Sequence, residues 1–252
     1  MDVLVVSNYE ELSRRAAELV DEAIHKRPNL VLGLPTGSTP LGLYAHLVRR
    51  FQAGATSWAK VRTFNLDEYY PVRPQDPWSF RRYMEEHLFR HVDLKPEHIH
   101  FLDGQAPDPE AECRRYEEAI ASVGGLGLVI LGLGVNGHIG FNEPGTPWDS
   151  RTHLTTLSQE TVTANFGAAP READDFYPPR QALTMGIATI MEARQILLLV
   201  SGANKSRALG RAFNGPVTPS IPASILQRHP HLTVIADRAA VGIKAAGRAL
   251  RA

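Results

Sequence analysis

The stretch LGLVILGLGVNGHIGFNEP, residues 126–144, joins an apolar run to a glycine-rich polar turn. The run at 126–133 lacks the alternation of polar and apolar residues that marks a half-exposed strand, so it predicts a strand buried on both faces of a parallel sheet. The glycines that follow allow the backbone to approach a ligand closely. Ligands of open α/β sheets bind beyond the carboxyl ends of the strands, which places a candidate site at this turn.

Six other short runs read as buried strands, and helical patterns separate them. The runs are 3–6, 30–34, 61–66, 99–102, 196–200 and 233–236. This alternation predicts an α/β fold with a single doubly wound, mainly parallel sheet and helices on both faces, a Rossmann-like open sheet. We expect one domain over residues 1–252. An irregular insertion at 165–181 is rich in Ala, Pro and acidic residues, and a lid is expected within about 150–181.

Composition narrows the function classes. The chain has 252 residues, and Lys+Arg and Asp+Glu are equal at 27 each, so it lacks the basic excess that nucleic acid or an anionic membrane would require. The single cysteine, Cys113, has no partner for a disulfide, which suits a reducing compartment. The longest apolar run is about half of a membrane span. We expect a cytoplasmic protein that acts on a small molecule.

A small, polar turn follows the second predicted strand. It reads Gly33-Leu34-Pro35-Thr36-Gly37-Ser38-Thr39-Pro40 and leads into a helical pattern at 41–51. Exposed backbone N–H groups and the helix dipole at such a turn can bind a phosphate. A plain helix cap is the alternative, because Ser or Thr before Pro is common at helix starts. The turn lacks the lysine and spacing of a P-loop.

Two adjacent carboxylates follow the third predicted strand, in Phe64-Asn65-Leu66-Asp67-Glu68-Tyr69. Adjacent side chains diverge in extended backbone, so only one of Asp67 and Glu68 is expected to face the crevice. A carboxylate there can act as general base for a C–H beside a carbonyl or imine. The alternative is a solvated turn.

The glycine-rich turn of the opening stretch holds His138 between Asn136 and Glu143. A histidine near a carboxylate forms a proton-transfer unit, although a structural histidine in a tight loop is the alternative. Residues 132–137 match GxGxxG formally, yet no acidic residue ends a second strand about 20 positions later, so the dinucleotide fingerprint fails.

The last cluster, Ser201-Gly202-Ala203-Asn204-Lys205-Ser206, follows the strand at 196–200. Lys205 is one of only five lysines in the chain, and it stands at a helix start, where its charge opposes the dipole. A nearby anion would favour that placement. A solvated lysine is the alternative.

Together these clusters resemble the glucosamine-6-phosphate deaminase family from residue 30 to about 237. Beyond the clusters, the resemblance rests on Ser150-Arg151-Thr152 and Ala182-Leu183-Thr184-Met185-Gly186. The related 6-phosphogluconolactonases share the glycine-threonine turn and a Gly-His pair, but residues 139–144 follow the deaminase pattern.

The resemblance implies conversion of glucosamine 6-phosphate and water to fructose 6-phosphate and ammonia without a metal or organic cofactor. Asp67 would move a proton between C2 and C1, and His138 would open the sugar ring with support from Glu143 and Asn136. The phosphate would bind to Thr36, Gly37, Ser38, Thr39 and Lys205. The expected partner is the substrate alone, and the expected state is a monomer or small homo-oligomer.

The chain departs from the family at three places. Asn136 stands where aspartate is common, although some members also have asparagine. No arginine directly follows Ala164-Asn165, and Arg171 is the nearest substitute for the usual phosphate-binding arginine. The run after Arg151 lacks the basic residues of members regulated by N-acetylglucosamine 6-phosphate, which argues against an effector site.

Two other functions remain open from the sequence. A lactonase or another sugar-phosphate isomerase on this fold would release no ammonia from an amino sugar phosphate. A non-catalytic sugar-phosphate sensor would normally carry a DNA-binding segment, and the chain has neither the length nor the basic charge for one.

Overall fold

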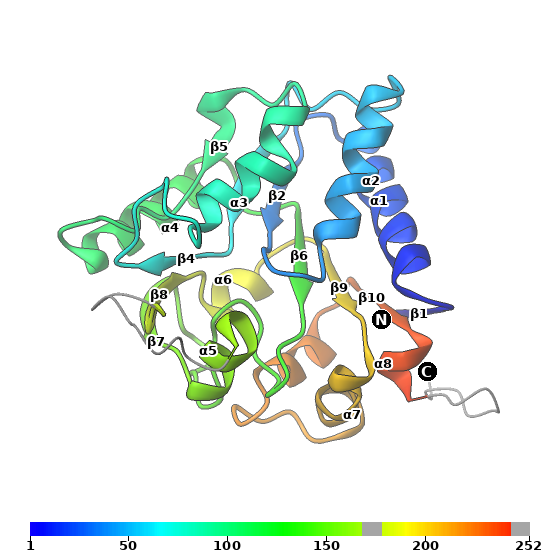
Figure 1. The fold of residues 1–252 in the computed structure, drawn as a ribbon, viewed down its shortest axis with the longest axis vertical. Helices are drawn as coiled ribbons and strands as arrows, with labels where there is room; N and C mark the ends of the chain where they lie inside the picture. The colour runs from blue at the N-terminus through cyan, green and yellow to red at the C-terminus, as the bar shows by residue number, and fades with distance from the viewer. Residues whose placement is uncertain (168–177, 243–252) are drawn as a thin grey trace.

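A computed structural model describes residues 1–167 and 178–242 of the chain (Figure 1). Its main sheet has seven parallel strands in the spatial order β1-β10-β9-β6-β2-β3-β5. These strands are β1 (Asp2–Val6), β2 (Val31–Leu34), β3 (Arg62–Asn65), β5 (Ile99–His100), β6 (Leu128–Gly132), β9 (Ile196–Val200) and β10 (Leu232–Asp237). The predicted fold class is therefore confirmed.

Helices cover both faces of this sheet. Alternate strand residues therefore pack into two separate hydrophobic cores, one on each face. In β6, Leu128 and Ile130 pack into one core, and Val129 and Leu131 pack into the other. The first core is covered by α1 (Tyr9–Lys26), α2 (Leu41–Gln52) and α3 (Phe80–His87). The second is covered by α4 (Pro109–Ser122), α6 (Ile187–Met191), α7 (Ser206–Asn214) and α8 (Arg238–Val241). Continuous apolar strands are thus explained by burial on both sides.

The strand order reverses between β2 and β6. After β2 the chain builds the sheet outward through β3 and β5, and then returns to add β6 on the other side of β2. The carboxyl ends of β2 and β6 therefore border a crevice that no crossover connection covers, which is where open α/β sheets bind ligands. The turns at 35–39 and 133–140 leave the sheet at this crevice.

All seven predicted strands are present, with small differences at their ends. The run at 99–102 forms only the two-residue β5, since this edge strand pairs with β3 at just two positions. The predicted helices at 41–51 and 109–123 correspond to α2 and α4. Cys113 is buried in α4.

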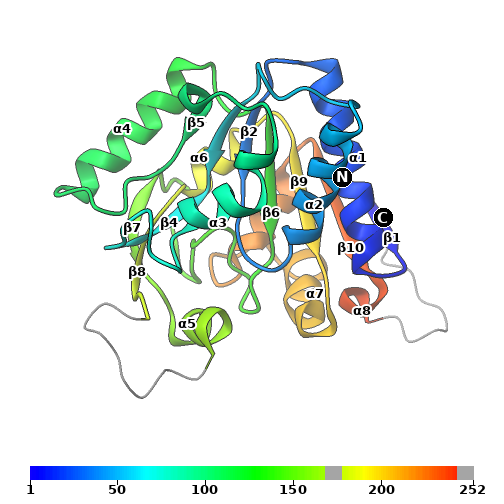
Figure 2. The ribbon, with the colours of Figure 1, turned by 45° about the horizontal axis from the view of Figure 1, so that its top comes forward.

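A second, smaller sheet was not predicted. Its antiparallel strands are β4 (Asp67–Tyr70), β8 (Gln181–Thr184) and β7 (His153–Thr156), in the order β4-β8-β7 (Figure 2). Each has four residues, and β4 consists of two acids and two tyrosines, so none shows the apolar run of a buried strand.

The irregular insertion predicted at 165–181 includes residues of a helix and of a strand. Its first residues belong to α5 (Gln159–Phe166), and its last residue begins β8. Residues 168–177 of the expected lid, which include Arg171, lie outside the described residues. Short 3-10 turns complete the structure at Phe89–His91, Pro96–His98, Ala203–Lys205 and Pro222–Arg228. No helix in the described part of the chain is long and apolar enough to cross a membrane.

Candidate active site

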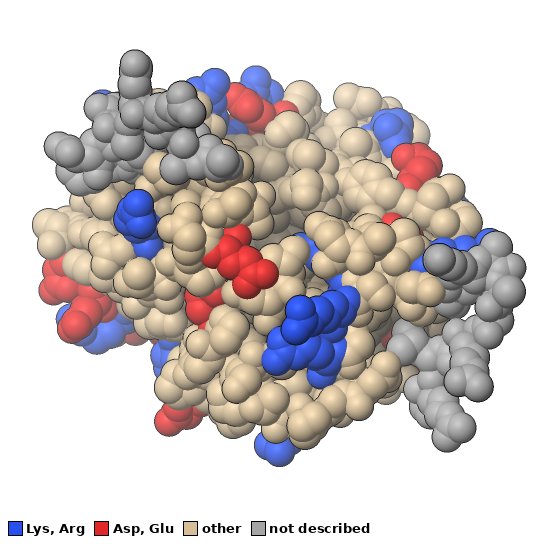
Figure 3. Space-filling view, turned by 60° about the horizontal axis from the view of Figure 1, so that its bottom comes forward, with Lys and Arg blue, Asp and Glu red and all other residues tan. Residues whose placement is uncertain are grey.

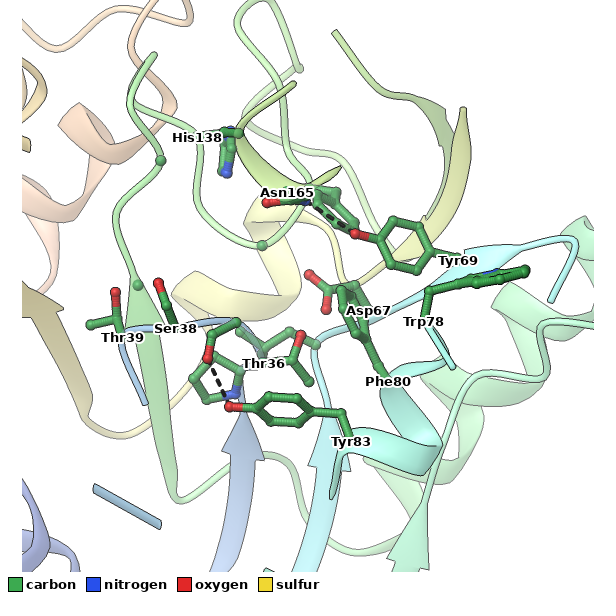
Figure 4. A pocket seen from close by; sticks show the side chains of 18 of the residues that line it. Thr36, Ser38, Thr39, Asp67, Tyr69, Trp78, Phe80, Tyr83, His138 and Asn165 are labelled. Atoms are coloured by element: carbon green, nitrogen blue, oxygen red, sulfur yellow. Dashed lines mark hydrogen bonds between the residues drawn. The ribbon is translucent and has the colours of Figure 1, made fainter. Parts of the chain in front are cut away.

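The four polar clusters meet around one pocket of about 560 Å³ at the carboxyl edge of the main sheet (Figure 4). This convergence was predicted from the strand ends. The pocket is lined by seven of the predicted site residues: Thr36, Gly37, Ser38, Thr39, Asp67, His138 and Lys205. Asn136 and Glu143 lie behind His138 instead of on the pocket wall.

The loop at 35–39 is held in place by three tyrosines from three helices. Tyr83 on α3 donates a 2.7 Å hydrogen bond to the carbonyl of Gly37, and Tyr9 on α1 donates to the carbonyls of Ser38 and Thr39 at 3.0 and 3.1 Å. Tyr44 on α2 donates to the carbonyl of Pro35. Four carbonyl oxygens of this loop are therefore occupied by hydrogen bonds from the helices.

The loop's backbone N–H groups stay available for a ligand. Within the described residues, those of residues 36–39 donate to no protein acceptor. Gly37 has a φ of +95°, which side chains with a Cβ rarely adopt. Lys205, at the end of the 3-10 turn before α7, reaches the same pocket, and partial burial lowers the pKa of its ammonium group. An anion bound here would receive N–H groups, hydroxyls and one cation together.

Asp67 enters the pocket from the first position of β4, as Figure 4 shows. Its side chain accepts no hydrogen bond from the described residues, and the residue is only 6% exposed. Burial raises the pKa of Asp67 to about 8, and the nearby charge of Glu68 acts in the same direction. A carboxylate with a pKa near the working pH can both take and return a proton.

Glu68 points to the opposite face of β4, where its carboxylate caps the N-terminus of α3. It accepts hydrogen bonds of 2.9 Å from the backbone N–H groups of Phe80 and Arg81, and another from the hydroxyl of Ser79. Burial raises the pKa of Glu68 to about 7, although these hydrogen bonds oppose the rise. Of the two adjacent acids, Asp67 therefore faces the crevice and Glu68 caps a helix.

The His138 ring packs against the backbone of the glycine turn. A Cβ at Gly134 would lie 2.5 Å from the ring, so this position requires glycine. Burial lowers the pKa of His138 to about 4; the carboxylate of Glu143 opposes this effect, and Lys205 adds to it. His138 is therefore neutral at physiological pH, with one ring nitrogen free to accept a proton.

In the described part of the chain, the side chain of Asn136 makes no hydrogen bond to the His138 ring. Its Oδ1 accepts a 3.1 Å hydrogen bond from the backbone N–H of His138, and its Nδ2 donates to Glu143 Oε2 at 2.7 Å. Asn136 therefore shapes the turn and holds Glu143. Glu143 Oε2 lies 3.9 Å from His138 Nδ1.

Sequence reasoning missed two parts of the site. An aromatic wall of Tyr69, Phe80, Phe141 and Phe166 closes one side of the pocket, with ring centroids 4.6 to 5.8 Å apart. The hydroxyls of Ser158 and Thr161 on α5 lie beside Glu143 and His138. Ser158 is a typical N-cap residue that could have marked the start of α5, but not the contact of Thr161 with the histidine.

The charged side chains around the crevice do not form a patch of a single sign. Figure 3 shows the end of the molecule at which the main strands finish, and Lys/Arg and Asp/Glu side chains lie there in small separate groups among uncharged surface. In the part of the chain that the structure describes, no group of three or more His, Cys, Asp or Glu side chains could hold a metal ion.

Sequence comparisons give one consistent result. The sequence model of the family described as glucosamine-6-phosphate isomerases/6-phosphogluconolactonase matches residues 7–235. Glucosamine-6-phosphate deaminase 2 of Bacillus subtilis is 47% identical over 251 residues, covering 98% of this chain and 99% of that protein. The glucosamine-6-phosphate deaminase of Thermoanaerobacter pseudethanolicus is 45% identical over 245 residues, covering 96% and 95%.

Solved structures agree with this result. A monomeric glucosamine-6-phosphate deaminase has a TM-score of 0.92 and 43% identity to this chain, covering 97% of it and all of the other chain. The 6-phosphogluconolactonase of Trypanosoma brucei has a TM-score of 0.74 at 20% identity, with 96% and 97% covered. The second likeness concerns the fold alone.

Proposed function

The chain belongs to the family of glucosamine-6-phosphate isomerases and 6-phosphogluconolactonases, and from its relatives and its pocket we infer the reaction and the role of each residue. The reaction is the conversion of glucosamine 6-phosphate and water to fructose 6-phosphate and ammonia. One observation carries the assignment of roles: a buried carboxylate and a neutral imidazole line the same pocket as a loop whose N–H groups have no acceptor among the described residues.

The phosphate binds to the N–H groups and hydroxyls of residues 36–39 and to Lys205. These groups contact the phosphate equally before and during reaction, so they supply binding energy that positions the sugar. The carbon chain then extends toward Asp67 and His138. Arg171 is proposed as an additional phosphate contact, and it lies outside the described residues.

His138 opens the ring, because its neutral imidazole accepts the proton of the C1 hydroxyl and returns it to the ring oxygen as the C1–O5 bond breaks. Asp67 takes the C2 proton of the open aldose, and the freed electron pair forms the C1=C2 double bond. O1 takes a proton from the neighbouring ammonium group, which gives the neutral enolamine. The same carboxyl group then gives the proton to C1, leaving an imine at C2. Water adds to that carbon, and ammonia leaves as the ketone forms.

The bound substrate itself lowers the pKa of Asp67. Its raised pKa means that much of the free enzyme carries a neutral carboxyl group at pH 7. The ammonium group of the bound amino sugar favours the carboxylate, since an opposite charge within a few ångströms lowers the pKa of an acid. The base is thus activated by the group that the reaction removes.

A coupled ammonia assay tests this function. With glucosamine 6-phosphate we expect ammonia and fructose 6-phosphate in equal amounts. Hydrolysis of 6-phosphogluconolactone without ammonia release from the amino sugar would identify a lactonase, and binding without turnover would identify a sensor. We also propose that the chain is a monomer, as the solved deaminase of similar structure is; sedimentation would check this.

A further inference from the structure

Glu143 is too far from His138 for a direct hydrogen bond. Its Oε2 lies 3.9 Å from His138 Nδ1 and already accepts the 2.7 Å bond from Asn136. Its Oε1 accepts bonds of 3.2 Å from both the backbone N–H and the hydroxyl of Ser158. Every hydrogen bond to this carboxylate from the described residues therefore comes from Asn136 or Ser158.

The hydroxyl of Thr161 on α5 lies within hydrogen-bond distance of His138 Nδ1. Thr161 Oγ1 lies 3.3 Å from His138 Nδ1 and 3.0 Å from Ser158 Oγ. Thr161 is 1% exposed, so water does not compete for its hydroxyl. Two hydroxyls thus connect the carboxylate of Glu143 to the imidazole of His138.

The direction of these bonds follows from their acceptors. The one proton of the Ser158 hydroxyl faces two acceptors, Glu143 Oε1 at 3.2 Å and Thr161 Oγ1 at 3.0 Å, and the charge of the carboxylate favours Glu143. The 3.0 Å contact between the two hydroxyls is then a hydrogen bond only if Thr161 donates to Ser158. Thr161 in turn can only accept at its 3.3 Å contact with the imidazole, so the proton must be on Nδ1. The negative charge of Glu143 on that side favours the same arrangement.

We propose that Thr161, acting with Ser158, is a positioning residue that holds neutral His138 in the tautomer protonated at Nδ1. This leaves Nε2 as the basic nitrogen for the ring-opening step. That catalytic consequence rests on the proposed function, whereas the tautomer itself does not. Glu143 acts on the histidine through the hydroxyls of Ser158, the N-cap of α5, and of Thr161 in its first turn, and α5 also carries Asn165 of the pocket wall.

The tautomer can be measured without turnover. In protein labelled with ¹⁵N at its histidine rings, the imidazole nitrogen shifts distinguish protonation at Nδ1 from protonation at Nε2. A His138→Gln spectrum identifies which of the ten histidine signals belongs to His138. At neutral pH without substrate we expect the wild-type ring to carry its proton on Nδ1. A proton on Nε2 would overturn the proposal, whatever the activity.

Substitutions then test Thr161 itself. Thr161→Val keeps the shape without the hydroxyl, and it should move the His138 signals toward the Nε2–H form and lower kcat roughly tenfold. Thr161→Ser should restore both properties. Thr163→Val, on the exposed side of the same helix, is the matched control and should change neither. A fall in kcat with an unchanged tautomer would show a structural role and refute the proposal.

The two proposals fail in different ways. If no deaminase activity is found but the tautomer responds as described, the proposed function is wrong and the positioning role stands. If Thr161→Val does not fold, the wild-type spectrum and Thr161→Ser still decide the question.

Discussion

The two ends of the pocket use charge in opposite ways. At the end that we propose binds the phosphate, backbone dipoles and Lys205 present positive charge, and three tyrosines hold the loop through its carbonyls. At the reacting end, burial raises the pKa of Asp67 to about 8 and lowers the pKa of His138 to about 4, so both groups lose charge near pH 7. In the proposed reaction, binding thus uses fixed positive charge, and proton transfer uses groups that burial makes neutral.

This difference predicts separate kinetic effects. Contacts to a phosphate are present in both the ground state and the transition state, so losing one should raise KM. Groups that move protons act only in the transition state, so losing one should lower kcat. Substitutions at each end can therefore break or sharpen the comparison.

The largest effect is expected for Asp67→Asn, because an amide keeps the shape but cannot take a carbon-bound proton. Turnover should fall by roughly 10²- to 10⁴-fold, the usual range for a general base. Affinity for a phosphate ligand, measured by calorimetry, should stay within a few-fold, and solvent deuterium should no longer enter C1. Substantial residual turnover would assign the base to another residue.

The same variant tests how burial of Asp67 makes the stability of the protein depend on pH. The unfolded chain releases the Asp67 proton near pH 3.8, whereas the folded chain keeps it up to about pH 8. Stability of the wild type therefore falls as pH rises through this window, and the amide avoids that loss. Asp67→Asn should raise Tm by several degrees at pH 8 and by almost nothing near pH 4, as thermal unfolding would show. An equal Tm difference at both pH values would mean that Asp67 ionises freely.

Lys205→Ala should have the next largest effect, on KM. Loss of a charge-assisted contact costs about 1.5–3 kcal/mol, which corresponds to roughly 10- to 150-fold in KM. Steady-state kinetics with Lys60→Ala as a surface control would check this. An unchanged KM with a lower kcat would place Lys205 in the chemistry instead.

Tyr83→Phe should produce the smallest change. It removes the 2.7 Å hydrogen bond to Gly37 but keeps the ring, so the loop loosens without losing a phosphate contact. KM should rise about two- to tenfold with little change in kcat. Tyr70→Phe is a suitable control, because its hydroxyl donates to Ala106 away from the pocket. A larger effect on kcat than on KM would show that the loop also orients the reacting carbons.

The sequence was sufficient for the main sheet and for the convergence of the site. Buried parallel strands appear as plain apolar runs, and strand ends of such a sheet share one edge, so Asp67, His138 and Lys205 could be placed together before any coordinates. The divergence of Asp67 and Glu68 followed in the same way from the geometry of extended backbone.

The rest depends on contacts between distant segments. Tyr9, Tyr44 and Tyr83 lie on three different helices, and no spacing rule connects them to residues 35–39. Thr161 meets His138 across 23 positions of chain. The small sheet was missed because its strands pair only with one another, in four-residue segments of mixed polarity.

The pairing of β4 with β8 determines which of two adjacent acids faces the pocket. Asp67 lies opposite Thr184, and Glu68 lies opposite Leu183. Successive residues of a strand point to opposite faces, so a shift of β4 by one residue would bring Glu68 into the pocket and put Asp67 under α3. The choice between the two acids for the proposed proton transfer is therefore fixed by the ladder hydrogen bonds between β4 and β8. A deletion or insertion next to β4 would exchange the two acids without altering either side chain.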